Sequence, residues 1–309
     1  MKTPLLLFCA LIAHTVSSQT IRIADNTPTR PGGPNIYATL QAAIDAATPG
    51  DIVYIQPSAT NYGSVTIGKQ ITLQGVGFGI TELGDRSSSI GSITLLSSAD
   101  GLSSVSNSVF KGFSFDQFLF AVGGFGTFTY DNIIIENISG RFITTSGATA
   151  SIHAVNNLIV RNCMVNGIYL PMTNANVRIY NNVLNSEIGG DNLNFSFSTN
   201  PLISNNFFYR VSRNGADQSC ISLDNSTGIR IENNLFSGTQ AAFRTLLNAN
   251  VVNNIFYSLS PGSILTNVVF KDNIFSNNLV APISTIPPTG NFGGINTGQN
   301  NLNGVSPGL

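Results

Sequence analysis

The sequence predicts an all-β solenoid, a coil in which each turn adds strands around one shared core. Two observations predict it. Segments similar to Ile-Arg-Ile-Glu-Asn-Asn-Leu-Phe (229–236) recur along the chain, and most of their copies lie 19 to 28 residues apart. Repeats of this length indicate stacked units, because no single unit can bury its apolar face alone.

The first Asn of the repeat marks one position of the coil. We align it at Gly112, Asn137, Asn162, Asn181, Asn205, Asn233, Asn253, Asp272 and Asn300. Asn tolerates left-handed backbone and its amide bonds to nearby main chain, so the Asn pair predicts a tight bend between two strands. Stacked amides can then hydrogen-bond from turn to turn. The functional alternative at this bend is an Asn-lined ligand groove.

Apolar residues occupy two columns around the bend. Two residues before the Asn stand Phe110, Ile135, Val160, Ile179, Ile203, Ile231, Val251 and Phe270; three after it stand Val165, Leu184, Phe208, Phe236, Phe256 and Phe275. Both columns are expected to point into the core. The position just before the Asn carries Lys111, Glu136 and Arg161 and is expected to face water, because side chains alternate along a strand. We interpret these charges as a solvated ladder.

The repeat resembles the right-handed parallel β-helix of the pectin-lyase-like superfamily, whose turns commonly carry such an Asn at one bend. The run from Tyr37 to Ile55 is also similar to the N-terminal cap and first strand of that superfamily. The resemblance covers residues 35–309. It implies a single-stranded right-handed parallel β-helix with an N-terminal capping helix, and it matches no specific enzyme family.

The N-terminal residues divide into three parts. Residues 1–18 have the charged start, apolar stretch and small residues of a secretory signal peptide, so the protein is expected at the cell surface, outside the cell or in the periplasm. Residues 19–34 are a lead-in with a short strand. A capping helix is expected at about 35–48, with Asn35 as its N-cap and Tyr37, Leu40, Ile44 and Ala47 on one face. No transmembrane segment is expected.

The small number of cysteines and the low charge argue against several classes of protein function. After the signal peptide, Cys163, Cys220 and His153 remain, which is no disulfide framework and no cluster of metal ligands. We interpret both cysteines as buried apolar residues and His153 as structural. Charged residues are 9% of the chain and the net charge is −1. This composition argues against a nucleic-acid partner and against a polybasic membrane anchor.

The resemblance supplies templates for chemistry. Pectate lyases of this fold hold calcium with clustered acidic residues and use Arg or Lys as base, while polygalacturonases use Asn-Thr-Asp, Asp-Asp and Gly-His-Gly motifs. None of these motifs occurs in the chain. The catalytic residues therefore stay unassigned, and no metal site is assigned.

The longest connection, between Phe208 and Cys220, indicates where a ligand would bind, because insertions in solenoids tend to build the binding face. We predict a shallow groove along the coil axis with five lining residues: Asp191, Arg213, Asp217, Asp224 and Arg244. In a lyase, the three Asp would hold Ca²⁺ and one Arg would be the base. The alternative is a set of solvated loop charges in which Asp224 pairs with Arg244.

Two functions of different class remain open. The favoured one is a non-catalytic extracellular module that binds carbohydrate, mediates adhesion or builds a surface structure. The alternative is a lyase or hydrolase of a uronate-containing polysaccharide. An extracellular polysaccharide is the expected partner in either case. Asn300-Asn-Leu302 opens another turn, so a further segment or a partner is expected to cover the C-terminal edge.

Overall fold

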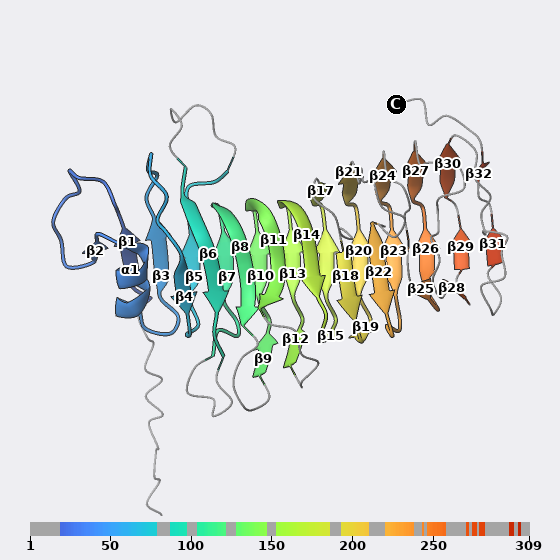
Figure 1. The fold of residues 1–309 in the computed structure, drawn as a ribbon, viewed down its shortest axis with the longest axis horizontal. Coiled ribbons are helices and arrows are strands. Elements are labelled where there is room, and N and C mark those ends of the chain that lie inside the picture. Colours follow the sequence, from blue (N-terminus) through green and yellow to red (C-terminus); the bar gives the residue numbers. More distant parts are fainter. Residues whose placement is uncertain are drawn as a thin grey trace, which may run out of the picture.

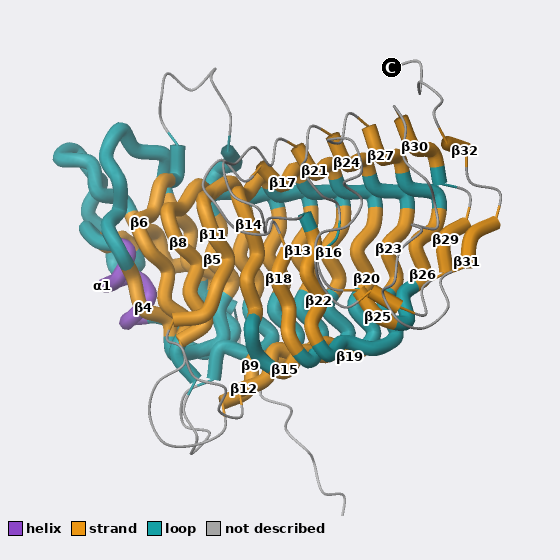
Figure 2. The backbone as a smooth tube through the Cα atoms, turned by 45° about the vertical axis from the view of Figure 1, so that its right-hand side comes forward, coloured by secondary structure: helices purple, strands orange, loops and turns teal. Residues whose placement is uncertain are grey.

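The protein is a parallel β-helix (Figures 1 and 2). The computed structural model describes residues 19–78, 87–97, 104–121, 128–146, 153–185, 193–209, 220–237, 243, 246–257, 270–271, 274–276, 278–281, 297–299 and 302–303. Successive strands lie side by side along the long axis of the coil, from β1 at one end to β31 at the other. All pairings between the named strands are parallel, which confirms the predicted solenoid.

The strands form two large sheets and two small ones. The first sheet contains, in spatial order, β2 (Ile36–Tyr37), β1 (Ile21–Ala24), β3 (Ile52–Ile55), β5 (Thr72–Gln74), β7 (Val109–Lys111), β10 (Ile134–Glu136), β13 (Ile159–Arg161), β16 (Arg178–Tyr180), β20 (Leu202–Ser204), β23 (Arg230–Glu232), β26 (Asn250–Val252), β29 (Ile274–Ser276) and β31 (Thr297–Gln299).

The second sheet contains β4 (Val65–Ile67), β6 (Ser89–Leu95), β8 (Ser114–Ala121), β11 (Ser139–Ser146), β14 (Met164–Leu170), β17 (Val183–Asn185), β21 (Phe207–Tyr209), β24 (Leu235–Ser237), β27 (Ile255–Tyr257), β30 (Leu279–Ala281) and β32 (Leu302–Asn303), with β18 (Leu193–Ser196) and β22 (Ile221–Asp224) as a branch from β14. The small sheets are β9 (Phe128–Asp131), β12 (His153–Asn156), β15 (Thr173–Ala175) and β19 (Ser198–Thr199), and the pair β25 (Leu246–Leu247) and β28 (Phe270–Lys271).

The two predicted inward columns form the core over most of their length. Phe110, Ile135, Val160, Ile179, Ile203, Ile231 and Val251 are in register and fully buried. In the second column, the rings of Phe208, Phe236 and Phe256 stack face to face with centroids 4.6 and 4.9 Å apart. Parallel in-register pairing brings like residues together, so each column forms a continuous apolar row along the interior.

The alignment is wrong at Asp272. Phe275, not Phe270, lies opposite Val251, and Val280, not Phe275, lies opposite Phe256. Phe270 pairs instead with Leu246 in the small sheet. The physical reason is the bend, because Asn278 continues the stack of amides from Asn254. The alignment of Asn300 is consistent with the strand register, because Gln299, the residue before it, pairs with Ser276, which ends β29 one turn earlier.

The two Asn residues of each pair have different roles at the bend between the first and second sheets. The first has left-handed backbone and is exposed, as at Asn181, Asn205 and Asn233 with φ of 58°, 55° and 57°. Gly112 takes this position two turns before Asn162, with φ of 75°. The second is buried, at Asn182, Asn206, Asn234, Asn254 and Asn278. The predicted bend is therefore confirmed.

The buried residues form an asparagine ladder. In it, the Oδ1 of each Asn accepts two hydrogen bonds from the Asn one turn earlier, one from its backbone N–H and one from its Nδ2. The Oδ1 of Asn234, for example, accepts from the N–H of Asn206 over 2.9 Å and from its Nδ2 over 3.1 Å. Each Nδ2 also donates to a core-strand carbonyl, as Asn234 does to Ile203. One turn before Asn182, Cys163 stands in place of the buried Asn, and its N–H donates to Asn182 Oδ1 over 2.9 Å.

Both cysteines are buried and form no disulfide with each other. Burial raises the pKa of Cys163 to about 12, and its Sγ lies 3.1 Å from the carbonyl oxygen of Arg161. Cys163 is therefore a protonated, packed side chain, as predicted from its place in the second-Asn column.

A short helix lies across the N-terminal end of the coil, as predicted, but it begins later than expected. Helix α1 spans Leu40–Ala46, and the Thr39 hydroxyl accepts a hydrogen bond from the Ala42 N–H, so Thr39 is the N-cap rather than Asn35. The preceding residues pair with β1 as strand β2, which places Tyr37 outside the helix. Leu40, Ala43 and Ile44 bury the apolar face of α1 against the first strands.

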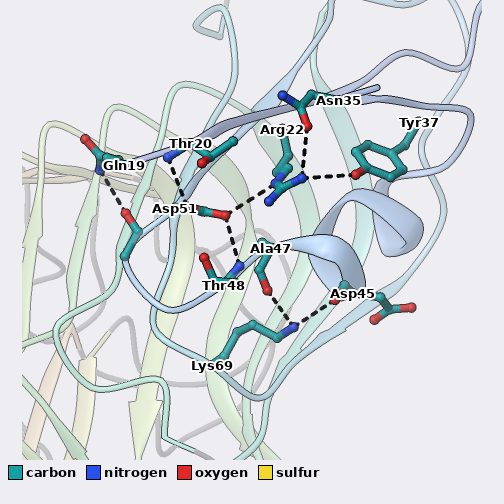
Figure 3. A network of polar contacts seen from close by, with 11 residues as sticks. Gln19, Thr20, Arg22, Asn35, Tyr37, Asp45, Ala47, Thr48, Asp51 and Lys69 are labelled. Atoms are coloured by element: carbon teal, nitrogen blue, oxygen red, sulfur yellow. Dashed lines mark hydrogen bonds and ion pairs between the residues drawn. The ribbon is translucent and has the colours of Figure 1, made fainter. Parts of the chain in front are cut away.

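A polar network fixes this cap (Figure 3). Asp51 is 2% exposed, and its carboxylate accepts hydrogen bonds from the backbone N–H groups of Thr20 and Thr48 at 3.0 and 2.9 Å. It also pairs with Arg22 over 3.3 Å. Burial alone would raise the pKa of Asp51, but the hydrogen bonds from Thr48, Thr20 and Arg22 outweigh it and lower the pKa.

This lowered pKa predicts an acid-sensitive cap. A carboxyl whose folded-state pKa lies below its unfolded value of 3.8 stabilises the fold above that value, and the contribution is lost as pH falls through the folded pKa. Asp51→Asn should lower the free energy of unfolding at pH 7 by about 1–3 kcal/mol. It should also flatten the loss of stability below pH 4. Denaturant titrations between pH 2 and 7 measure both effects.

The matched control is Asp116→Asn, because the Asp116 side chain is 51% exposed in its ion pair with Arg141. This substitution should change the unfolding free energy by less than about 1 kcal/mol. An acid profile of Asp51→Asn as steep as that of the unsubstituted protein would contradict the assignment.

Candidate functional site

Of the five predicted groove residues, Asp224 is the one that the structure describes. Asp191, Arg213, Asp217 and Arg244 lie outside the described residues. Asp224 ends strand β22, lies opposite Ser196 and is partly exposed. His153 lies in β12 opposite Phe128, where its backbone alone is described. The predicted groove and the pairing of Asp224 with Arg244 therefore stay predictions.

The described strands nevertheless relate the predicted residues to one region of the fold. Strands β17, β21 and β24 are consecutive neighbours. The connection after β17 carries Asp191 and the one after β21 carries Arg213 and Asp217, whereas Arg244 directly follows Phe243, beyond the connection after β24. The first two connections lead to β18 and β22, and the third leads to Phe243; Leu193, Ile221 and Phe243 are again in register. Three connections of different length thus begin and end at positions that are in register from one turn to the next.

On one flank of these connections lies a polar strip, formed by Tyr169, Asn194, Ser222 and Asp224. The first three are in register on β14, β18 and β22, at positions that alternate with the buried residues Ile168, Leu193 and Ile221. The ring of Tyr169 also contacts Phe142, with centroids 5.5 Å apart. Ser222 is buried, so the partly exposed groups of the strip are the Tyr169 hydroxyl, the Asn194 amide and the Asp224 carboxylate. Asp224 lies two residues further along β22, beside the row rather than in it.

On the other flank lies an aromatic rim, formed by Phe207, Tyr209 and Tyr257. Tyr209 and Tyr257 end strands β21 and β27, with Ser237 of β24 between them in register. Their side chains are 42% and 38% exposed, and Tyr209 contacts Phe207 with ring centroids 5.5 Å apart. At about 4.8 Å per strand, the two tyrosines lie about 10 Å apart along the axis.

Phe197 is a third exposed aromatic residue next to the polar strip. It follows β18 in left-handed backbone with φ of 53°, and its N–H donates to the Asp224 carbonyl over 2.8 Å. One turn further on, Asn225 takes the same conformation with φ of 49°. Left-handed backbone is unfavourable for a bulky residue, so an exposed Phe here is held at a cost in stability.

The aromatic rim was not among the features predicted from the sequence, although a signal for it exists. Phe-Phe-Tyr (207–209) and Ile-Phe-Tyr (255–257) alternate around a core residue, so the tyrosine in each faces water. Phe197 has no such signal, because its exposure depends on the left-handed turn that follows β18.

Among the described residues, no group of three or more His, Cys, Asp and Glu could hold a metal ion. Asp224 therefore belongs to no such group there. The same part of the chain contains no helix long and apolar enough to cross a membrane.

Comparisons with known proteins give likenesses in fold. No family model matches the chain, and no curated protein matches it. A solved alginate lyase from Paenibacillus sp. str. FPU-7 is 14% identical, with 86% of this chain and 95% of that chain covered and a TM-score of 0.38. The PL6 family alginate lyase AlyGC is 16% identical, with 77% and 36% covered and a TM-score of 0.43.

A tailspike protein of E. coli bacteriophage HK620, solved in complex with a pentasaccharide, is 14% identical, with 84% of this chain and 67% of that chain covered and a TM-score of 0.28. The predicted parallel β-helix is confirmed by the strand pairings of the structure itself. At these identities, the likeness concerns the fold alone.

The strained backbone of Phe197 generates a prediction. Phe197→Asn should raise the free energy of unfolding by about 1 kcal/mol, because Asn adopts left-handed backbone more readily and the Phe side chain is already 52% exposed. The reverse change at the equivalent position, Asn225→Phe, should lower it by a similar amount. Urea unfolding of both variants is the measurement. A less stable Phe197→Asn variant would show that the ring is packed rather than held for a ligand.

Proposed function

We propose that this protein is a secreted, non-catalytic module that binds an extended polysaccharide along its second sheet. The observation that carries the proposal is the pair of exposed tyrosines, Tyr209 and Tyr257, at matching positions two turns apart. The signal peptide predicted for residues 1–18 supports secretion.

Aromatic rings suit sugar ligands for a physical reason. A pyranose presents an apolar face of C–H groups, and a Tyr side chain offers a large rigid ring together with a hydroxyl that stays in water. Two such rings, repeated along the coil axis, favour a ligand that itself repeats along its length. The polar strip on the other flank supplies hydroxyl, amide and carboxylate groups that would fix the orientation of a bound chain.

The alternative is a polysaccharide lyase that acts on uronates. It would need Ca²⁺ held by Asp191, Asp217 and Asp224, and Arg213 or Arg244 as base. This assignment depends on residues outside the described part of the chain. The binding experiment therefore includes an assay for lyase activity.

The test is a double substitution of the rim. Tyr209→Ala with Tyr257→Ala should weaken binding to the polysaccharide about tenfold, if each ring contributes about 0.7 kcal/mol. Binding is measured by calorimetry against polygalacturonate, alginate and a neutral glucan. Absorbance of unsaturated products, followed with and without calcium, detects a lyase in the same samples.

Met164→Ala is the matched control, because Met164 is 47% exposed on the same sheet, two strands from Tyr209. It should leave binding unchanged. Equal losses in the two variants, or no binding to any of the polymers, would overturn the proposal. Calcium-dependent product formation would replace the binding module with the lyase.

A further inference from the structure

The outer face of the first sheet carries the densest group of described arginines. Arg161, Arg178 and Arg230 stand on β13, β16 and β23, and their side chains alternate with the fully buried Val160, Ile179 and Ile231. The sequence predicts a solvated ladder that includes Arg161 and assigns no role to Arg178. This face lies on a different sheet from the aromatic rim.

Two of the three arginines are already matched to a carboxylate. Arg161 donates to Glu136 through Nε and Nη2 over 2.7 and 2.5 Å. Arg230 donates to Glu232 through Nε and Nη2, both over 2.7 Å. In each pair, both guanidinium nitrogens converge on one carboxylate oxygen, which neutralises the charges and holds the guanidinium group in place.

Arg178 lies on the face between them without such a match. It is exposed, and its guanidinium makes no hydrogen bond or ion pair with any residue in the described part of the chain. Ile159 and Leu202 are its neighbours on the adjacent strands, so no carboxylate stands beside it in the ladder. Its five N–H donors are therefore available.

Tyr180 adds a neutral donor on the same side of the same strand. Its hydroxyl oxygen accepts a hydrogen bond from Arg161 Nη1 over 3.1 Å, which fixes the position of the oxygen. The O–H proton donates to no described residue. Two residues along a strand are about 7 Å apart, so an oxyanion between Arg178 and Tyr180 can contact both.

We propose that Arg178 and Tyr180 form a second binding site, which takes the carboxylate or sulfate group of an acidic glycan. The planar guanidinium matches an oxyanion bidentately, and the tyrosine hydroxyl supplies a third donor. The site does not depend on the aromatic rim. Duplex DNA suits the face poorly, because affinity for DNA requires several cationic contacts, and Arg161 and Arg230 are already paired with carboxylates.

The experiment uses the full chain with Tyr209→Ala and Tyr257→Ala already introduced, which separates this site from the rim. In that background, Arg178→Gln should weaken binding to polygalacturonate about three- to tenfold, and Tyr180→Phe about two- to threefold. Arg178→Lys should restore part of the affinity, because it retains the charge without the planar fork. Methyl-esterified polygalacturonate should bind no variant, whereas dextran sulfate should follow the same order as polygalacturonate.

Arg30→Gln is the matched control, since Arg30 is exposed on the lead-in and its removal changes the net charge equally. Equal losses for Arg30→Gln and Arg178→Gln would overturn the site in favour of general attraction. Undiminished binding of the methyl ester would exclude oxyanion recognition, and tighter binding of duplex DNA would replace the glycan with a nucleic acid. Binding that depends on Arg178 but not on the tyrosines would retain this site and reject the proposed function.

Discussion

The hydrogen-bonded stack of buried asparagines is the interaction on which the rest of the structure depends. A bend between two parallel sheets turns the backbone sharply and leaves donors and acceptors inside the coil, where each must find a partner. The ladder from Asn182 to Asn278 provides these partners within the protein, because each amide bonds to the next turn and to a core-strand carbonyl. It also fixes the register, since a slip by one residue would replace Asn234 in the ladder and would move a charged residue, Arg230 or Glu232, into the buried position of Ile231.

With the bend fixed by the ladder, the inward columns, the outward columns and the connections have different roles. The inward columns are apolar and fully buried, so sequence change there acts on stability. The outward columns are free to carry Tyr209 and Tyr257 on one sheet and Arg178 on another without disturbing the core. Connections of variable length follow β17, β21 and β24, next to the aromatic rim. An extended surface assembled from small repeated contributions suits a polymeric ligand better than a small molecule.

The fold could be predicted from the sequence to a large extent because its determinants are local and periodic. The Asn pair, the apolar positions on either side and the interval between copies together predict the bend, the core and the parallel register. The alignment failed at Asp272 because Phe270-Lys-Asp imitates the repeat, and only the ladder from Asn254 to Asn278 distinguishes the two. The predicted start of the helix was wrong because Ile36 and Tyr37 pair with β1, a contact that the amphipathic pattern does not contain.

The site was harder to predict than the fold. Tyr209 follows from alternation, whereas Phe197 and the unmatched Arg178 depend on contacts between turns.

The asparagine ladder can be tested directly with two substitutions in one pair. Asn234→Leu keeps the size of the side chain but leaves the Asn206 N–H and Nδ2 without their partner, so it should lower the free energy of unfolding by about 2–5 kcal/mol. Asn233→Gly preserves the left-handed bend and should change it by less than about 0.5 kcal/mol. Urea titrations of both variants give the comparison. Equal stability of the two variants, or a more stable Asn234→Leu protein, would contradict the view that the ladder holds the coil together.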